Sequence, residues 1–244
     1  MCGRYTIALT WQQLWTLSQP FWQPLPEIVP RYNVAPKSEV PILRMIEAGD
    51  GDGDESDIRP GGSFARWWLI PRWARTPDSS YSMFNARSED AHTKPAFKAS
   101  MHDRRCVIPA SGFYEWKAFD SEGAAPAKRP HYIYRADGAP LYFAGLWERW
   151  GDEALGQIET CTVLTTTPNA EMRLLHDRMP CVLEPEEIER WIDPGCRVDE
   201  ARPLLRPAAD GVLTSHPVAK RVGSVRNDGP DLIEPVDVFR ESLF

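Results

Sequence analysis

The sequence lacks the features that mark membrane, secreted and disulfide-stabilised proteins. It contains no apolar run of about 18 residues, whereas a membrane-spanning helix needs about 20. Its N-terminus has no basic segment followed by an apolar one, as a secretory signal requires. The five cysteines are odd in number and widely spaced, without a C-x-x-C pair, which argues against a disulfide framework and a zinc site. We expect a cytoplasmic protein with no metal, no cofactor and no membrane partner.

A net positive charge is absent as well. The formal net charge is −7, which by itself disfavours a nucleic-acid partner. The charge is unevenly distributed, however. From residue 66 to residue 117 nine lysines and arginines stand against five acids, so this middle part carries a local charge of +4. A polyanionic partner is therefore plausible for the middle of the chain.

The composition indicates a globular protein built on strands. The chain has 244 residues and 42% hydrophobic content, enough for one substantial core, and it shows neither a repeat nor a linker. Ten tryptophans and 23 prolines favour short elements joined by proline-containing loops. Strands are predicted at residues 40–46, 64–70, 106–109, 112–117, 131–135, 141–147 and 158–166. Short helices are predicted after Thr10, from Pro168 to about His176 with Thr167 as the cap, and from Pro185 with Ile188, Trp191 and Ile192 on one face.

An acidic, glycine-rich segment at about residues 47–62 interrupts the first part of the chain. Its alternating aspartates suggest an EF-hand, but that loop needs glycine at its sixth position and a carboxylate at its twelfth. Glu55 and Gly61 stand there instead. We therefore reject calcium binding and predict a flexible insertion within one domain covering residues 1–244.

Cys2 directly follows the initiator methionine. Because residue 2 is small, we expect Met1 to be removed, which leaves a free α-amine beside the thiol. With a pKa near 7.8, roughly 14% of an α-amine is neutral at pH 7, against about 0.04% of a lysine. Two nucleophiles on adjacent carbons can attack one electrophilic carbon in succession. The alternative is that residue 2 is frayed, or is a small buried hydrophobe.

Glu115 and His176 are candidates for proton transfer. Glu115 lies on an apolar predicted strand, where desolvation favours the neutral carboxyl of a general acid or base. The alternative is a surface glutamate paired with Lys117. His176 follows a predicted helix, whose dipole favours the protonated imidazole. The alternative is simple capping of the last helical carbonyls.

Candidate nucleic-acid contacts lie in the basic middle part. Asn85 and Arg87 end a polar loop, where an amide could orient a substrate and a guanidinium could hold a phosphate. Trp67 and Trp68 are adjacent on a predicted strand, so one ring points to the core and the other could stack on a nucleobase. The alternative for both rings is core packing.

A series of motifs in fixed order resembles those of one known family. The motifs are Met1-Cys2-Gly3-Arg4-Tyr5, Tyr32-Asn33-Val34-Ala35-Pro36, Trp68-Leu69-Ile70-Pro71 with Trp73, Asn85-Ala86-Arg87-Ser88-Glu89, Arg105-Cys106-Val107-Ile108-Pro109 with Gly112-Phe113-Tyr114-Glu115-Trp116, and His176-Asp177-Arg178-Met179-Pro180. Over nearly its whole length the chain is thus similar to the SRAP family (SOS-response-associated peptidase, or abasic-site-processing proteins). So many ordered motifs are far more specific than one short pattern.

The resemblance implies a fold, a partner and a set of roles. The fold would be a single α+β domain with a mainly antiparallel, barrel-like β core flanked by short helices. The partner would be single-stranded DNA containing abasic sites, bound by a monomer that joins the nucleoid when on DNA. The catalytic residues would be Cys2, Asn85, Glu115 and His176. The residues that contact DNA would be Arg4, Trp67, Trp68, Arg87 and Arg105.

This chemistry is coherent on its own terms. A ring-opened abasic deoxyribose carries an aldehyde, with which the Cys2 α-amine condenses to an imine. Addition of the thiol to the same carbon then gives a thiazolidine. Our hypothesis is that His176 assists ring opening, Glu115 moves protons and Asn85 orients the sugar.

Two other functions compete with this interpretation. One is a thiol peptidase that uses Cys2, Glu115 and His176 to cleave its own N-terminus or other proteins, with Cys2 as an N-terminal nucleophile. The other is a noncovalent single-strand-binding module in which Cys2 has no role. The first predicts peptide cleavage, and the second predicts salt-sensitive binding that leaves no adduct after denaturation.

Overall fold

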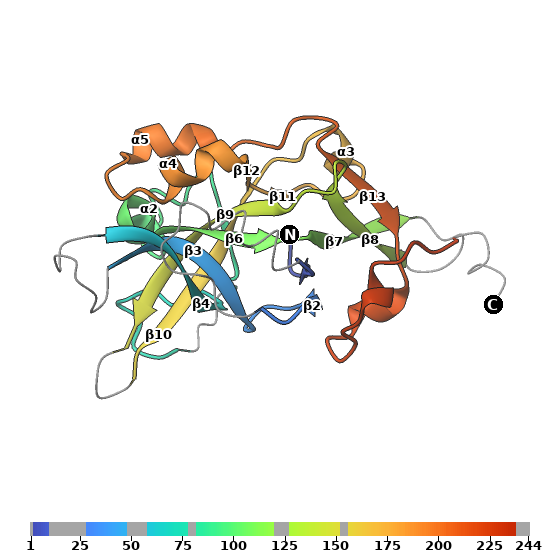
Figure 1. Ribbon diagram of the computed structural model, residues 1–244, viewed down its shortest axis with the longest axis horizontal. Coiled ribbons are helices and arrows are strands. Elements are labelled where there is room, and N and C mark those ends of the chain that lie inside the picture. Colours follow the sequence, from blue (N-terminus) through green and yellow to red (C-terminus); the bar gives the residue numbers. More distant parts are fainter. Residues whose placement is uncertain are drawn as a thin grey trace.

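The computed structural model describes residues 2–9, 28–47, 58–77, 82–119, 127–151 and 156–237. The short helix predicted after Thr10 lies outside these residues. The described chain is α+β, with strands in two sheets and only short helices (Figure 1). This confirms the predicted fold class.

Five long strands form a closed barrel. Each pairs with the next in the order β10, β4, β3, β6 and β9, and β9 pairs again with β10. Within this ring the β4–β10 contact is parallel and the other contacts are antiparallel. The bounds are β3 (Glu39–Glu47), β4 (Ile58–Trp67), β6 (Arg105–Ala110), β9 (Leu141–Trp150) and β10 (Ile158–Thr166). Closure leaves the ring without a free edge.

Short strands are added along the barrel. They are β5 (Asn85–Arg87), parallel to β10, β11 (Met179–Pro180), also on β10, and β12 (Val182–Leu183) on β9. In this register Asn85 lies opposite Val163, and Pro180 lies opposite Thr165. The motif around Asn85 and the motif after His176 are therefore brought to the same end of β10.

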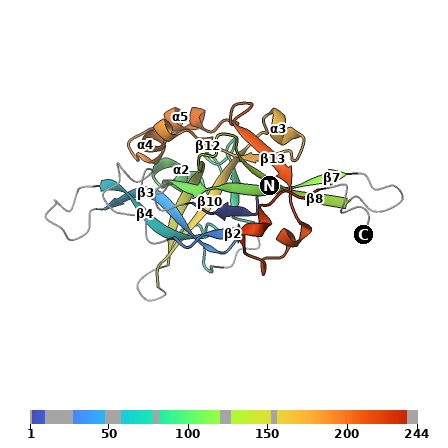
Figure 2. The same ribbon diagram turned by 45° about the vertical axis from the view of Figure 1, so that its right-hand side comes forward.

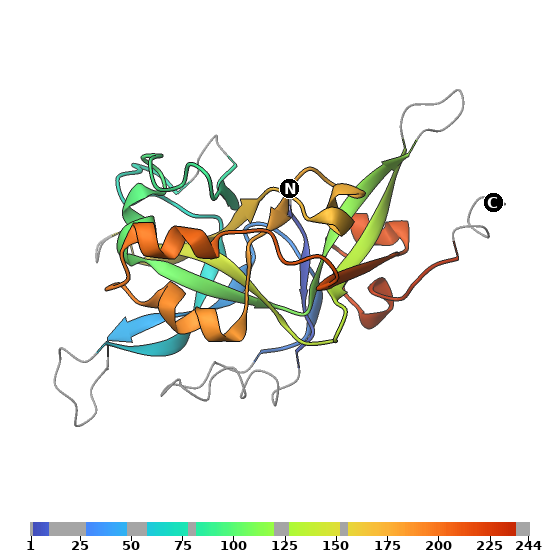
Figure 3. The ribbon, with the colours of Figure 1, turned by 90° about the horizontal axis from the view of Figure 1, so that it is seen from above.

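The second sheet is antiparallel, in the order β13–β8–β7–β1–β2. Its strands are β1 (Tyr5–Ile7), β2 (Arg31–Val34), β7 (Gly112–Phe119), β8 (Ala127–Arg135) and β13 (Leu213–Pro217). The dark-blue β1 lies between the barrel and the β7–β8 ribbon (Figure 3). Because β1 pairs on both sides, the chain just before it is held firmly in place.

Short helices cover one side of the barrel. They are α2 (Lys98–Asp103), α4 (Ile188–Ile192) and α5 (Val198–Ala201), while α3 (Ala170–Arg173) lies nearer the second sheet (Figure 1). Helical 3₁₀ turns occupy residues 185–187, 202–204, 220–223 and 230–232. The predicted apolar face of α4 is confirmed, because Ile188, Trp191 and Ile192 are buried. In the described part of the chain, no helix has the length and apolar character needed to cross a membrane.

Aromatic rings join β1 to the barrel. The Tyr5 ring lies edge-on to Trp67, with centroids 5.0 Å apart, and to Phe143 at 6.0 Å. Phe113 of β7 contacts Phe143 in the same way at 5.9 Å. All four rings are fully buried, and each such ring contributes about 1.5–3 kcal/mol through burial. This packing fixes the start of the chain against β7.

The structure corrects the boundaries of the acidic insertion. Glu47 pairs with Ile58 and Leu43 pairs with Gly62, so both ends of the predicted segment 47–62 belong to the β3–β4 hairpin. Glu47 and residues 58–62 are therefore strand residues whose backbone groups are used in the ladder, and the flexibility of the insertion stays a prediction. Residues 48–57 lie outside the described residues.

The helix before His176 also starts later than predicted. Asn169, not Thr167, is its N-cap, since Asn169 Oδ1 accepts a hydrogen bond from Met172 N at 3.0 Å. The helix proper ends at Arg173, and one more turn follows in which His176 N donates to Met172 O at 2.8 Å. Asparagine is among the most favourable N-cap residues, which explains the shift.

Candidate functional site

The residues just before β1 place Cys2 against β7 and β5. Tyr114 N donates to Arg4 O at 2.9 Å, which extends the β1–β7 pairing toward the N-terminus. On the other side, Asn85 Nδ2 donates to Cys2 O at 2.8 Å. Cys2 is fully buried, which excludes the frayed residue that the sequence left open. Asn85 thus contacts the backbone of Cys2 directly.

Burial makes the Cys2 thiol a poor acid. Desolvation is the main cause that raises the pKa of the thiol well above its usual value, and the nearby Glu115 carboxyl raises it further. A weak contact from Sγ to Arg4 O, at 3.8 Å, has the opposite effect. At neutral pH the sulfur therefore carries its proton, and it needs a base before it can act as a thiolate.

Glu115 is suited to be that base. It lies on β7 with only 3% of its surface exposed. Burial raises the pKa of this carboxyl from 4.5 to about 7, as the sequence predicted in direction. At neutral pH both the acid and the carboxylate form are present, so the group can give and take protons. The alternative of a surface glutamate is wrong.

His176 faces Glu115 from the turn after α3. Its Nε2 lies 4.0 Å from Glu115 Oε2. Desolvation lowers the pKa of the imidazole, so the predicted protonated form is corrected: burial outweighs the helix dipole and the nearby Asp177. Two neighbours share Nδ1: Arg178 N donates to it at 3.0 Å, and Asp177 Oδ1 lies 2.7 Å from it. Nε2 is thus the ring nitrogen that is directed to the side where Glu115 lies.

Arg4 is tied to the protein by a residue to which the sequence analysis gave no role. Its Nη1 donates to Asn33 Oδ1 at 2.7 Å and to Val222 O at 2.9 Å. The Asn33 amide in turn donates to Ser224 O and Asn227 O, at 3.0 and 2.7 Å. Asn33 therefore anchors the segment 222–227 beside the start of the chain. The only sequence signal for Asn33 was its place in the motif Tyr32-Asn33-Val34-Ala35-Pro36. A DNA contact by Arg4 stays a prediction.

Arg87 and Arg178 differ in their exposure and in their partners. Arg87 is exposed on β5, where its guanidinium is available to a ligand. Arg178 binds Glu89 with both arms, at 2.6 and 2.8 Å, and its hydrogen bonds lower the pKa of that carboxyl. This pair joins the motif around Asn85 to the motif that contains His176. The sequence analysis gave no role to this contact.

The two adjacent tryptophans behave differently. Trp67 is fully buried and its indole donates to Phe84 O at 2.8 Å, so the prediction that it packs beside nucleotides is corrected. Trp68 is half-buried, with its ring 5.9 Å from the Phe84 ring and Lys37 Nζ 5.1 Å from its centroid. The expectation of one inward and one outward ring therefore holds, and a stacking role stays a prediction for Trp68 alone.

The predicted DNA contact of Arg105 is also corrected. Only 1% of its surface is exposed. Its guanidinium donates to backbone carbonyl oxygens of α2, of the last turn of α4 and of the segment after it, which are those of Met101, His102, Trp191, Asp193 and Cys196. These bonds satisfy carbonyls that the ends of the two short helices leave without partners. Arg105 holds helices to the barrel and is not accessible to DNA.

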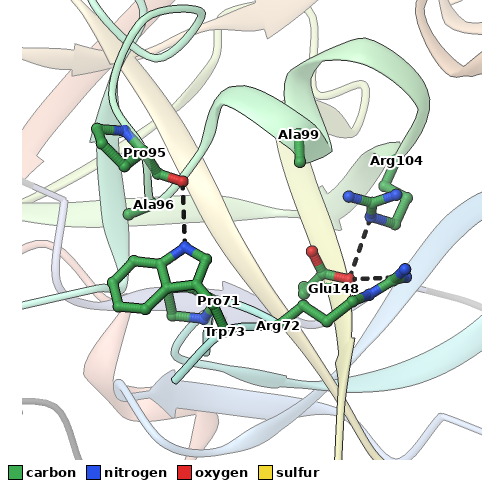
Figure 4. A pocket seen from close by; sticks show the side chains of 8 residues that line it. All are labelled: Pro71, Arg72, Trp73, Pro95, Ala96, Ala99, Arg104 and Glu148. Carbon is green, nitrogen blue, oxygen red and sulfur yellow. Dashed lines mark hydrogen bonds and ion pairs between the residues drawn. The ribbon is translucent and has the colours of Figure 1, made fainter. Parts of the chain in front are cut away.

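A pocket of about 320 Å³ shares no lining residue with the Cys2 site (Figure 4). On one side Trp73, 68% exposed, donates from its indole to Pro95 O at 3.4 Å. On the other, the buried Glu148 carboxylate binds Arg104 at 3.1 Å and Arg72 at 3.3 Å. Two of the nine cations counted in the middle of the sequence therefore share one carboxylate within the protein.

Metal ligands and disulfides were also considered. All five cysteines are buried and free. In the segments that the structure describes, no group of three or more histidines, cysteines or acids could hold a metal ion. The absence of a metal or cofactor stays a prediction.

The chain matches one family model along most of its length. The model described as SOS response associated peptidase (SRAP) covers residues 1–225. The abasic site processing protein YoqW of Bacillus subtilis is 36% identical over 238 residues, which is 96% of this chain and 99% of YoqW. The abasic site processing protein YedK of Escherichia coli is 33% identical over 249 residues, 97% of this chain and all of YedK. The abasic site processing protein HMCES of Xenopus tropicalis is 33% identical and matches 85% of this chain.

Solved structures share the fold. A crystal structure of a protein from Bacteroides thetaiotaomicron has a TM-score of 0.76 at 23% identity, covering 96% of this chain and all of the other. Another, from Bordetella bronchiseptica, has a TM-score of 0.72 at 25% identity, covering 89% of this chain and all of the other.

Proposed function

Because this chain belongs to the SOS response associated peptidase (SRAP) family, we propose that it processes abasic sites in single-stranded DNA by bonding covalently to them through Cys2. The observation that carries the proposal is the convergence of Asn85, Glu115 and His176 on the start of the chain. Relatives named for abasic site processing support the choice of DNA lesion.

The first step uses the α-amine that is free after Met1 is removed. The neutral amine attacks the aldehyde carbon of the ring-opened sugar and forms a C–N bond. Protonated Glu115 then gives its proton to the departing hydroxyl, so one water leaves, a protonated imine (iminium) forms, and Glu115 is left as the carboxylate. A carboxyl with a pKa of about 7 has this proton available at neutral pH.

The second step closes the ring. The Glu115 carboxylate takes the thiol proton and the sulfur attacks the iminium carbon, while the nitrogen keeps the single proton that it already carries. The product is a thiazolidine, and the second step releases nothing further. Because burial keeps the thiol protonated, the amine reacts first and the sulfur second. Glu115 ends each cycle of proton transfer in the form in which it began.

The remaining residues prepare the sugar and the nucleophile. The Nε2–H of His176 donates to the ring oxygen of the sugar and assists its opening, which a neutral imidazole does as a hydrogen-bond donor. Asn85 holds the Cys2 carbonyl and so fixes the direction of the α-amine. Arg87 is the exposed guanidinium nearest in sequence to Asn85 and binds the DNA backbone.

A crosslinking experiment tests the proposal. The protein is incubated with a single strand from which a uracil base has been excised, then separated on a denaturing gel. We expect a retained band whose mass equals the sum of protein without Met1 and DNA, less one water. Cys2→Ala should abolish the band, and Glu115→Gln and His176→Ala should slow its formation. Cys196→Ala, a buried cysteine elsewhere, serves as the control.

A full band from Cys2→Ala, or an adduct mass without loss of water, would overturn this chemistry. Cleavage of peptides without any retained DNA would support the thiol peptidase instead. Salt-sensitive retention that disappears on denaturation would support a noncovalent binding module.

A further inference from the structure

The ribbon of β7 and β8 continues past Glu115 with basic residues on both strands. In its register Glu115 lies opposite His131, and the next pair on the same face is Lys117 opposite Arg129. Two residues along a strand advance by about 6.8 Å, so this pair lies one short step from the Glu115 carboxyl. The ribbon projects from the body of the protein (Figure 2).

These residues line a surface pocket of about 260 Å³. Its walls are formed by Lys117, Phe119, Arg129, His131 and Pro217, none of them acidic. The guanidinium carbon of Arg129 lies 4.9 Å from the centroid of the Phe119 ring. The pocket therefore combines cations with an aromatic surface, and His131 connects it to the Glu115 site.

The charges in this pocket repel one another in the free protein. Like charges directly opposite on two strands destabilise the pair. Among the described residues neither Lys117 nor Arg129 binds a carboxylate, and Arg129 Nε and His131 Nδ1 are buried without a hydrogen-bond partner. Burial, then Lys117, Arg129 and His216, lower the pKa of His131 to about 4. An anion between the two strands would offset the repulsion and use the free donors.

We propose that this pocket binds a phosphodiester of the same DNA strand, next to the abasic nucleotide at Glu115. The proposal rests on the proposed function, because the abasic sugar at Cys2 fixes where the strand runs. A phosphate suits a lysine beside an arginine, since its oxygens accept from both groups at once. A sugar or base attached to that phosphate can also lie against Phe119.

The test removes the charge from the protein side of the proposed contact and, separately, from the DNA side. The protein variant is Lys117→Gln with Arg129→Gln, and the DNA variant carries one uncharged methylphosphonate linkage, placed in turn at each position around the abasic site. With the unmodified strand below saturation, we expect the double variant to form adduct about ten-fold more slowly, with the rate at saturation unchanged. One methylphosphonate position should slow the wild type similarly and leave the double variant unaffected. Lys98→Gln, an exposed lysine on α2, is the matched control.

Two further readouts separate the possible failures. Thermal unfolding should show a raised Tm for the double variant, because a repulsive pair is removed, whereas a purely structural role would lower it. Binding of an intact strand without an abasic site is measured in parallel by fluorescence anisotropy. If the wild type forms no adduct yet the double variant weakens this binding, the proposed function fails and the subsite stands. Equal adduct rates for wild type and double variant on every strand would overturn the subsite alone. The subsite would also be overturned if each methylphosphonate slowed adduct formation by the same factor in both proteins.

Discussion

At the scale of single residues, the buried Glu115 carboxyl serves the proposed chemistry and lowers the free energy of unfolding at neutral pH. The folded protein binds the Glu115 proton with a pKa of about 7, against 4.5 when exposed. The stability that Glu115 contributes is therefore fully present below pH 4.5 and is lost as pH rises through 7, by on the order of 3 kcal/mol. Glu115→Gln, which stays neutral, should be more stable than wild type at pH 8 and nearly equal at pH 5. Urea unfolding at both pH values measures this.

The control for this prediction is Glu39→Gln, because Glu39 is exposed on β3. It should change the free energy of unfolding by less than about 0.5 kcal/mol at either pH. His176 titrates in the opposite sense and lies 4.0 Å from Glu115, so the comparison is repeated in a His176→Ala background to isolate the carboxyl. A Glu115→Gln protein that is less stable than wild type at pH 8 contradicts the assignment of a neutralised, buried carboxyl.

Arg105 and Arg87 should separate stability from DNA contact. Arg105→Ala leaves several backbone carbonyls without donors, and we expect a loss of about 3–5 kcal/mol in the free energy of unfolding. Arg87→Ala removes an exposed side chain and should change it by less than about 0.5 kcal/mol, while reducing adduct formation at low strand concentration. Denaturant titration checks the first effect and gel crosslinking the second. Equal unfolding curves for both variants would show that Arg105 is not structural.

At the scale of elements, the cap of α3 controls where His176 lies. Asn169→Ala removes the hydrogen bond to Met172 N and should lower the free energy of unfolding by about 1–2 kcal/mol. Because His176 N is bound to Met172 O, fraying of α3 also loosens the imidazole. We expect faster amide hydrogen exchange at Met172 and slower adduct formation.

The matched control for α3 is Asn169→Asp, which keeps an accepting oxygen at the N-cap and should restore both readouts. If Asn169→Ala slows the adduct without changing hydrogen exchange, then Asn169 acts on the site by some route other than the helix.

At the scale of the whole molecule, the net charge predicts different salt dependences for the initial binding of DNA and for the covalent adduct. A chain with a net charge of −7 gains little from general attraction to DNA, so only local contacts hold the strand before the bond forms. We predict that raising salt from 50 to 200 mM slows adduct formation at least ten-fold and leaves formed adduct unaffected. Salt added before incubation tests the rate of adduct formation, and salt added afterwards tests the formed adduct. A denaturing gel measures the adduct in both cases. Loss of formed adduct on salt addition would mean that no covalent bond was present.

Much of the fold was predictable from local sequence, because alternation and apolar runs mark strands wherever they later pair. The strand 158–166 was predicted with its observed ends, and α4 with its buried face. The position of the candidate site residues relative to one another depends on long-range pairing, such as β5 beside β10 and β1 beside β7, which no local pattern encodes. Residue chemistry singled out Cys2, Glu115 and His176 one at a time, and the resemblance to a family joined them into one site.

The errors have a common physical cause. Arg105 and Trp67 are polar or aromatic side chains that the fold buries and satisfies with backbone carbonyls. Composition cannot distinguish such a side chain from an exposed one that binds DNA, because the same N–H groups can donate to a buried backbone carbonyl or to a DNA group. The lowered pKa of His176 was missed for a related reason, since burial depends on which segments pack around the ring.

The pairing of β1 with β7 sets when the protein can become active. Ile7 ends β1, and its partner strand begins only at Gly112. At a synthesis rate of about 5–20 residues per second, on the order of ten seconds separate the two strands during translation. Until then Cys2 has no Glu115 beside it, and a pairing so distant in sequence also forms slowly. A nascent chain is therefore expected to react with DNA more slowly than the completed fold, in which Glu115 lies beside Cys2.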